Sequence, residues 1–157
     1  MIKQGLIFAA TACGAIAAPA FAADRVSLAS EVFVEKIVVG PDGRANTLLK
    51  QPEIVMPGDN LVFILKYRNQ GNEAARNFIL TNPMPSAVAF REATGAGALF
   101  SVNGGKNWGL LGELKVQGSD RSFRAARPDD VTHVRWAFRQ PLPAGATGKV
   151  SFRGTVR

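Results

Sequence analysis

Asn60-Leu61-Val62-Phe63-Ile64-Leu65-Lys66-Tyr67-Arg68 is the clearest secondary-structure signal in the chain. Leu61, Phe63, Leu65 and Tyr67 alternate with a second set of side chains that ends in two basic residues. Such alternation is typical of a β-strand that places one set in a core and the other toward a second surface. Turn-forming residues flank the stretch at 56–59 and 69–72, where Asn and Gly tolerate positive φ.

Further strands are predicted on both sides of this one. The candidate ranges are 26–39, 75–81, 87–93, 99–102, 106–109, 131–138 and 149–157. Asn103-Gly104-Gly105 indicates a hairpin turn, and the polar segment 110–130 is expected to be a loop. About seven to eight strands in residues 23–157 favour one all-β domain, an antiparallel sandwich of immunoglobulin-like type.

Four motifs support this prediction by resemblance. Pro57-Gly58-Asp59-Asn60-Leu61-Val62-Phe63, Asn69-Gln70-Gly71-Asn72, Thr81-Asn82-Pro83-Met84-Pro85 and Leu142-Pro143-Ala144-Gly145 occur in this order. Their order and spacing resemble the bacterial domain of unknown function 11 family over residues 31–157. The resemblance implies an immunoglobulin-like sandwich of exported and surface proteins, with no established catalytic residues. The chain differs from that family's usual pattern in having one copy and a longer 101–130 segment.

Residues 1–22 are predicted to be a signal peptide. Lys3 precedes an apolar stretch, and the small residues Ala20 and Ala22 suit a signal peptidase site after Ala22. The apolar stretch is shorter than the roughly 20 residues that span a bilayer, so we expect no transmembrane anchor. The alternative is a lipoprotein signal acylated at Cys13, although the preceding residues lack the usual Leu. The periplasm, the cell surface and the medium all remain open as destinations.

The charge balance favours anionic partners. The formal net charge is +7, and removal of Lys3 with the signal would lower it by one. An exported basic domain would meet acidic glycans, lipid head groups or surface proteins, and we expect it not to meet nucleic acid.

Catalytic and metal-binding chemistry is poorly represented. His133 is the single histidine, and an arrangement with Asp129 or Asp130 would need a nucleophile that the sequence does not indicate. Asp42, Asp59, Asp129 and Asp130 are candidate calcium ligands without the spacing of a calcium loop, and Asp42 and Asp59 also suit turns. We therefore expect no enzyme activity, no cofactor and no metal centre.

The candidate binding residues are basic or aromatic. If the strands at 131–138 and 149–157 pair, their outward residues form a positive stripe that neighbouring strand residues extend. The set is Arg135, Lys149, Arg153, Arg157, Lys66 and Arg68. Trp108 is a weaker candidate for stacking on a sugar, against the alternative of ordinary packing, and Trp136 is expected in the core.

Two functions follow as hypotheses. The first is a non-enzymatic envelope or extracellular binding module that uses the basic face to hold an anionic envelope component or another surface protein. The second is a structural subunit of a surface filament or layer, joined through strand edges at 149–157 or 24–39. Basic residues on an edge also prevent such pairing, so the second hypothesis stays open.

Overall fold

The computed structural model describes residues 26–157, so the predicted signal peptide 1–22 lies outside the described residues. The described chain is all-β with antiparallel sheets and contains two short 3-10 turns but no α-helix. The elements are β1 (Val26–Val39), β2 (Ala45–Lys50), β3 (Asn60–Asn69), β4 (Ile79–Pro83), β5 (Val88–Thr94), β6 (Ala98–Ser101), η1 (Leu111–Glu113), β7 (Lys115–Gln117), β8 (Phe123–Ala125), η2 (Pro128–Asp130), β9 (His133–Ala137) and β10 (Thr147–Val156). No helix in residues 26–157 is long and apolar enough to cross a membrane.

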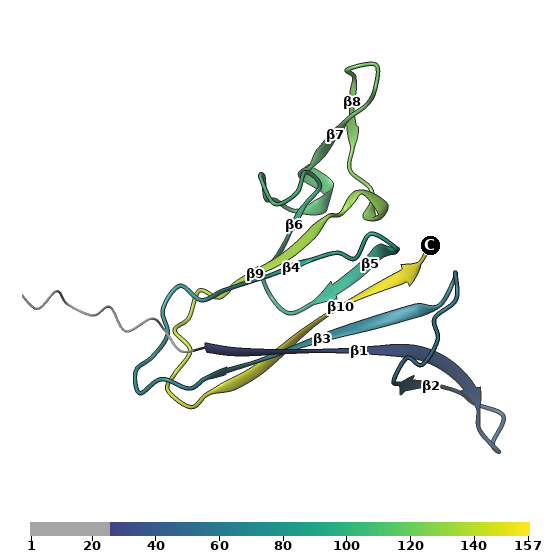
Figure 1. Cartoon of the computed structure of the whole chain (residues 1–157), viewed down its shortest axis with the longest axis horizontal. Coiled ribbons are helices and arrows are strands. Elements are labelled where there is room, and N and C mark those ends of the chain that lie inside the picture. Colours follow the sequence, from purple (N-terminus) through teal and green to yellow (C-terminus); the bar gives the residue numbers. More distant parts are fainter. Residues whose placement is uncertain (1–25) are drawn as a thin grey trace, which may run out of the picture.

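Two sheets pack against each other and share one core. The larger has the strand order β2-β1-β3-β10-β5 and the smaller the order β4-β9-β6. Phe152 of the larger sheet lies 6.5 Å from Trp136 of the smaller one, ring centroid to ring centroid, and both side chains are fully buried. Figure 1 shows the smaller sheet above one face of the larger one.

The core-facing set of the alternating stretch lies as predicted, whereas Val62 of the alternate set is also buried, at 4% exposed. Leu61, Phe63 and Leu65 of β3 belong to the buried core cluster, and the half-buried Tyr67 packs against it. On β9, Val134 and Trp136 are fully buried while His133 lies on the opposite face. Burial of alternate side chains on facing sheets removes apolar surface from water, which is the main favourable contribution to this fold.

Two predicted strands are shorter than expected. The strand at 75–81 begins only at Ile79, because Asn77 has a φ of 53° that a continuous strand does not accommodate; Ala75 makes an isolated bridge to Leu142. It also continues to Pro83, which β4 tolerates as an edge strand. The strand at 106–109 is reduced to one bridge between Phe100 and Gly109.

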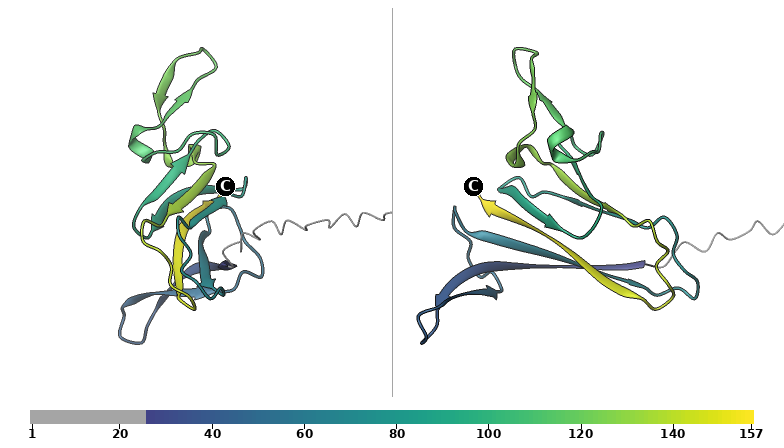
Figure 2. Two further views of the ribbon diagram at one scale, coloured as in Figure 1. Left: turned by 90° about the vertical axis from the view of Figure 1, so that its left-hand side faces the viewer. Right: turned by 180° about the vertical axis from the view of Figure 1, so that it is seen from behind.

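The prediction of a loop at 110–130 is wrong in part. Strands β7 and β8 pair in a hairpin, and the hairpin projects away from both larger sheets (Figures 1 and 2). Its bend places Arg121 at a φ of 66°, a conformation that Gly adopts without strain. The strands have only three residues each, which is why no alternation was visible in the sequence.

The last strand is not a sheet edge. β10 lies between β3 and β5, so the expectation of an open edge at 149–157 is wrong. The N-terminal strand β1 pairs with β3 along Val26–Glu35 but with β2 only from Val34 onward. The open edges at this end of the larger sheet are therefore the first half of β1 and the outer side of β2. Residues 24–25 of the second predicted edge lie outside the described part.

Candidate anion-binding surface

Three adjacent strands place polar and basic side chains on one face of the larger sheet. In the register of β1, β3 and β10, Arg68 lies opposite both Ser27 and Thr147, and Lys66 lies opposite both Ala29 and Lys149. Cross-strand partners in an antiparallel sheet share a face. Leu65 and Val150, one position away, are buried in the core, so these six residues are on the face that points away from it.

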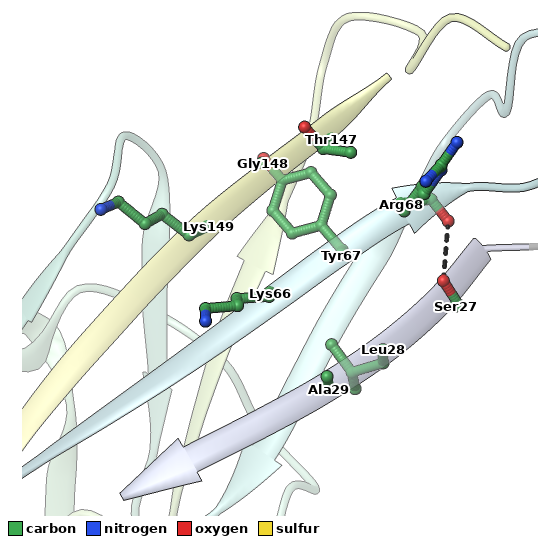
Figure 3. Close-up of a pocket in the computed structure, with 9 residues that line it drawn as sticks. All are labelled: Ser27, Leu28, Ala29, Lys66, Tyr67, Arg68, Thr147, Gly148 and Lys149. Carbon is green, nitrogen blue, oxygen red and sulfur yellow. Dashed lines mark hydrogen bonds between the residues drawn. The ribbon is translucent and has the colours of Figure 1, made fainter. Parts of the chain in front are cut away.

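A hollow of about 440 Å³ lies at these positions (Figure 3). Its lining is Ser27, Leu28, Ala29, Lys66, Tyr67, Arg68, Thr147, Gly148 and Lys149. Short side chains at Ser27, Ala29 and Thr147 stand beside the long ones of Lys66, Arg68 and Lys149. This contrast in side-chain length leaves the sheet surface open between the three basic groups.

The hollow carries an excess of positive charge. Lys66, Arg68 and Lys149 are all exposed. The Nζ atom of Lys66 lies 2.7 Å from Oε1 of Glu31, whereas Arg68 and Lys149 make no ion pair within residues 26–157. Lys66 and Lys149 are direct cross-strand partners, and like charges in such positions repel each other, although the bond to Glu31 offsets part of the charge of Lys66. A bound anion would relieve this repulsion, so the arrangement suits a phosphate, sulfate or carboxylate group.

Arg153 is on the same face but is already neutralised. Its Nε atom donates to Oε1 of Glu35 at 2.9 Å, and its Nη1 atom donates to Glu92. The bonds to Glu92 and then to Glu35 raise the pKa of Arg153 above its usual value. Since two carboxylates surround this guanidinium, it fixes β1, β10 and β5 together and is poorly placed to bind a further anion.

Arg135 does not join the predicted stripe. Its strand β9 pairs with β4 and β6 and not with β10, so the expected pairing of these two strands is wrong. The guanidinium carbon lies 3.6 Å from the ring centroid of Trp108, and Nε donates to Oγ1 of Thr81 at 3.1 Å. The sequence could not show this because two similar alternating strands can lie in one sheet or in facing sheets.

Trp108, the predicted stacking residue, is held within its own loop. Its indole N–H donates to the carbonyl of Gly105 at 2.8 Å, and its ring makes an edge contact with His133. Arg135 covers one face of the half-buried ring. One face of the Trp108 ring is therefore occupied by Arg135 and is not free to stack on a sugar.

Arg157 and His133 lie away from the hollow. Arg157 donates from Nη2 to the carbonyl of Asp129 at 2.9 Å, near the opposite end of β10. The Nδ1 atom of His133 lies 3.1 Å from Oγ1 of Thr132. His133 therefore contacts a hydroxyl and an aromatic ring, and the carboxylate of Asp130 is bound elsewhere, by Arg124.

The four candidate calcium ligands are not brought together. Asp59 accepts from Lys36 at 2.8 Å and also from the Met56 N–H, and these bonds lower its pKa, with Lys36 as the larger cause. Asp42 faces Arg44, and the Arg124 guanidinium lowers the pKa of Asp130 to about 2. In residues 26–157 no three carboxylate, imidazole or thiol groups lie close enough to hold a metal ion.

The three basic residues of the hollow could be predicted from the sequence, whereas the short side chains that leave it open could not. Ser27, Ala29 and Thr147 are ordinary strand residues whose role depends on the register of β1, β3 and β10. The usable signals were the β-branched residues of 26–39 and the alternation of 149–157, the two segments that flank β3 in the sheet.

The fold and this surface define an all-β protein of two packed antiparallel sheets with a basic hollow on the outer face of the larger one. Comparisons with known protein families, curated proteins and solved structures find no match for this chain.

Proposed function

We propose that this protein is a non-enzymatic, exported binding domain that holds an anionic component of the cell envelope in the hollow between Lys66, Arg68 and Lys149. The observation that carries the proposal is the direct opposition of Lys66 and Lys149 across β3 and β10 at an open hollow. Glu31 offsets the charge of Lys66 in part, while Arg68 and Lys149 carry no ion pair in the described chain, so an anion of suitable size would compensate the remaining positive charge.

The proposal includes export of the protein and an immunoglobulin-like fold. The predicted signal at 1–22 would bring the domain to the envelope, where glycans and lipids carry phosphate or carboxylate groups. An immunoglobulin-like sandwich, as the resemblance to the domain of unknown function 11 family implies, is supported by the two antiparallel sheets that share one core. The Thr132 hydroxyl beside His133 donates to the carbonyl of Ser101, and the Asp130 carboxylate is bound by Arg124, which favours a structural role for these groups.

Retention on two immobilised polymers tests the proposal, one a uronic acid glycan and the other a poly(glycerol phosphate). We expect the wild-type chain to bind at least one of them in a salt-dependent manner, and the variant Arg68→Gln/Lys149→Gln to bind about tenfold more weakly. The matched control is Lys106→Gln/Lys115→Gln, which removes the same charge from exposed lysines elsewhere. If both double variants lose retention equally, binding depends only on net charge, and the hollow then has no specific role.

A second candidate is a subunit of a surface assembly joined through strand edges. The observation in its favour is that β2 forms the outer edge of the larger sheet with all six of its residues exposed. An unpaired strand edge offers backbone donors and acceptors to another strand. Sedimentation of the purified chain tests this candidate, since a monomer at every concentration would exclude it.

A further inference from the structure

The first half of β1 is an open strand edge. β1 pairs with β3 along Val26–Glu35, but β2 pairs with it only from Val34 onward. Residues 26–33 make no backbone hydrogen bond to a described residue outside β3. In Figure 1, β2 lies beside one end of β1 and leaves the other end uncovered. The outward backbone N–H and C=O groups of this half are therefore free to pair with a further strand.

The anion-binding hollow adjoins this edge. Ser27 and Ala29 of β1 line it and share its face with their β3 partners Arg68 and Lys66 (Figure 3). A strand added to β1 would lie about 4.8 Å from β1 and roughly twice that distance from β3. Because Ser27 and Ala29 are short, an acidic side chain on the added strand can extend across them toward the two basic groups.

The other face of the same edge is apolar. Val26, Leu28 and Val32 point away from the hollow, since alternate residues of a strand lie on opposite faces and Val34 of this set is buried in the core. Val32 packs against the core, but Leu28 is 54% exposed. An added strand would place apolar side chains beside Leu28 and remove its surface from water. The edge therefore fits a strand with one acidic face and one apolar face.

We propose that an extended segment of another protein adds to the free edge of β1, with acidic side chains in the hollow and apolar side chains beside Leu28. This deepens the proposed function and rests on it, because the anionic component is then an acidic protein segment. Strand addition combines main-chain hydrogen bonds, which give affinity, with contacts of alternate side chains, which give specificity. A glycan or a lipid surface has no peptide backbone to match the open edge.

Glu31 sets the register of the added strand. It shares the face of the hollow, and its Oε1 atom accepts from Nζ of Lys66 at 2.7 Å. An acidic partner residue opposite Glu31 would be repelled, whereas a basic one would be stabilised. Both neighbours of β1 are antiparallel, and we assign the same direction to the partner. Opposite residues 32 to 27, its order is then apolar, basic, apolar, acidic, apolar, acidic.

A second copy of this chain fits the edge less well. Glu31 is the single acidic residue in 26–33, and it is already bound to Lys66. Antiparallel pairing of two β1 edges would also place two basic hollows on one continuous sheet face, where like charges repel. The charge of the site therefore selects a different, acidic partner.

Calorimetric titration of the purified chain with a synthetic peptide of this order tests the proposal. The apolar positions are valines, and the control peptide has the same composition with the acidic residues distributed over both faces. We expect the ordered peptide to bind about tenfold more tightly than the control or better. Equal binding of the two peptides would show attraction by charge alone and would overturn the proposal. Absence of binding by either peptide would overturn it too.

Backbone pairing is tested with two further peptides, N-methylated at alternate residues. The N–H groups of alternate residues face opposite sides of a strand, so only one of the two sets meets β1. One methylated peptide should lose about tenfold in affinity or more, and the other should bind like the parent peptide. Equal effects of the two methylation patterns would exclude strand addition.

The apolar contact is tested on the protein. Leu28→Ser should weaken peptide binding about fivefold and leave retention on the anionic polymers unchanged. Leu110→Ser is the matched control, because Leu110 is 53% exposed and lies outside this edge. Circular dichroism of each variant verifies folding. Equal peptide binding by both variants would contradict a contact with Leu28.

The two proposals fail in different ways. Arg68→Gln/Lys149→Gln should weaken binding of the peptide and of the polymers. If the polymers are retained but no peptide binds, the strand partner is wrong and the anion-binding hollow stands. If the double variant binds both as tightly as the wild type does, the hollow has no role and both proposals are overturned.

Discussion

The ring of Tyr67 lies against the backbone of Gly148 so closely that a Cβ atom at Gly148 would overlap it. The two residues are cross-strand partners in β3 and β10. Phe78 and Phe138 hold the ring from the other side, with centroids 5.3 and 5.0 Å away, and burial raises the pKa of the Tyr67 hydroxyl. The glycine therefore allows an aromatic cluster to close this end of the core directly beneath the hollow.

Gly148→Ala should destabilise the protein by about 1–3 kcal/mol, the usual cost of forcing an extra methyl group into a packed site. Tyr67 would have to leave its contacts with Phe78 and Phe138. Urea unfolding measures the change. Gly112→Ala is the control, because no atom lies within 4 Å of a Cβ built there. Similar stability of the two variants would show that Tyr67 can move freely.

Asn69→Ala should cost about 2–4 kcal/mol, because it leaves buried backbone groups without partners. The Asn69 amide donates to the carbonyls of Glu73 and Leu142 at 2.7 and 2.9 Å, and its oxygen accepts from the Gly71 N–H. The side chain is 1% exposed. Thermal unfolding would check this, with Asn72→Ala as an exposed control expected to change stability by less than about 0.5 kcal/mol.

Stability should fall between about pH 4 and pH 2 as Asp130 becomes protonated. Arg124 donates to both carboxylate oxygens, at 2.6 and 2.7 Å, and lowers the folded-state pKa from 3.8 to about 2. A lowered pKa stabilises the fold above the unfolded value, and the contribution is lost as the pH falls through the folded value. Since Arg124 is 44% exposed, we expect only about 1 kcal/mol.

Asp130→Asn isolates that contribution. The variant should be less stable than the wild type at neutral pH. Its free energy of unfolding should also change less between about pH 4 and pH 2. Asp129→Asn serves as the neighbour control, since this carboxylate makes no ion pair in the described chain. If the free energy of unfolding changes equally with pH in the wild type and in both variants, groups other than Asp130 cause the loss of stability in acid.

The strands could be predicted where one face is buried. β1 was predicted closely because it is rich in β-branched residues, and β10 because its apolar side chains alternate; the turn at 69–72 was also placed correctly. The reason given for that turn was wrong, since no residue in it has positive φ and the Asn69 side chain holds it instead.

The sequence did not show which strands belong to the same sheet, and the composition of the basic surface depends on this. The patterns of β9 and β10 are equivalent, yet β9 lies in the facing sheet, which removes Arg135 from the basic surface. Likewise, Glu35 and Glu92 are far apart in sequence, and only strand pairing places both beside Arg153. Charge at a strand position is visible in a sequence, but its neutralisation is a property of the neighbouring strands.

Single substitutions of Arg153 and Lys149 should show that Arg153 stabilises the fold and that Lys149 binds the anion. Arg153→Gln leaves Glu35, whose side chain is only 18% exposed, without its cation, so we expect a loss of about 1 kcal/mol in stability and unchanged retention on the anionic polymer. Lys149→Gln removes the repulsion with Lys66, so stability should stay equal or rise by a few tenths of a kcal/mol while retention weakens.

Added salt should narrow the stability difference between Lys149→Gln and the wild type, because it screens the same repulsion. Urea unfolding at low and high salt, together with retention, measures both effects. The opposite pattern, with retention lost in Arg153→Gln and kept in Lys149→Gln, would move the anion site from the hollow to the carboxylate-bound arginine.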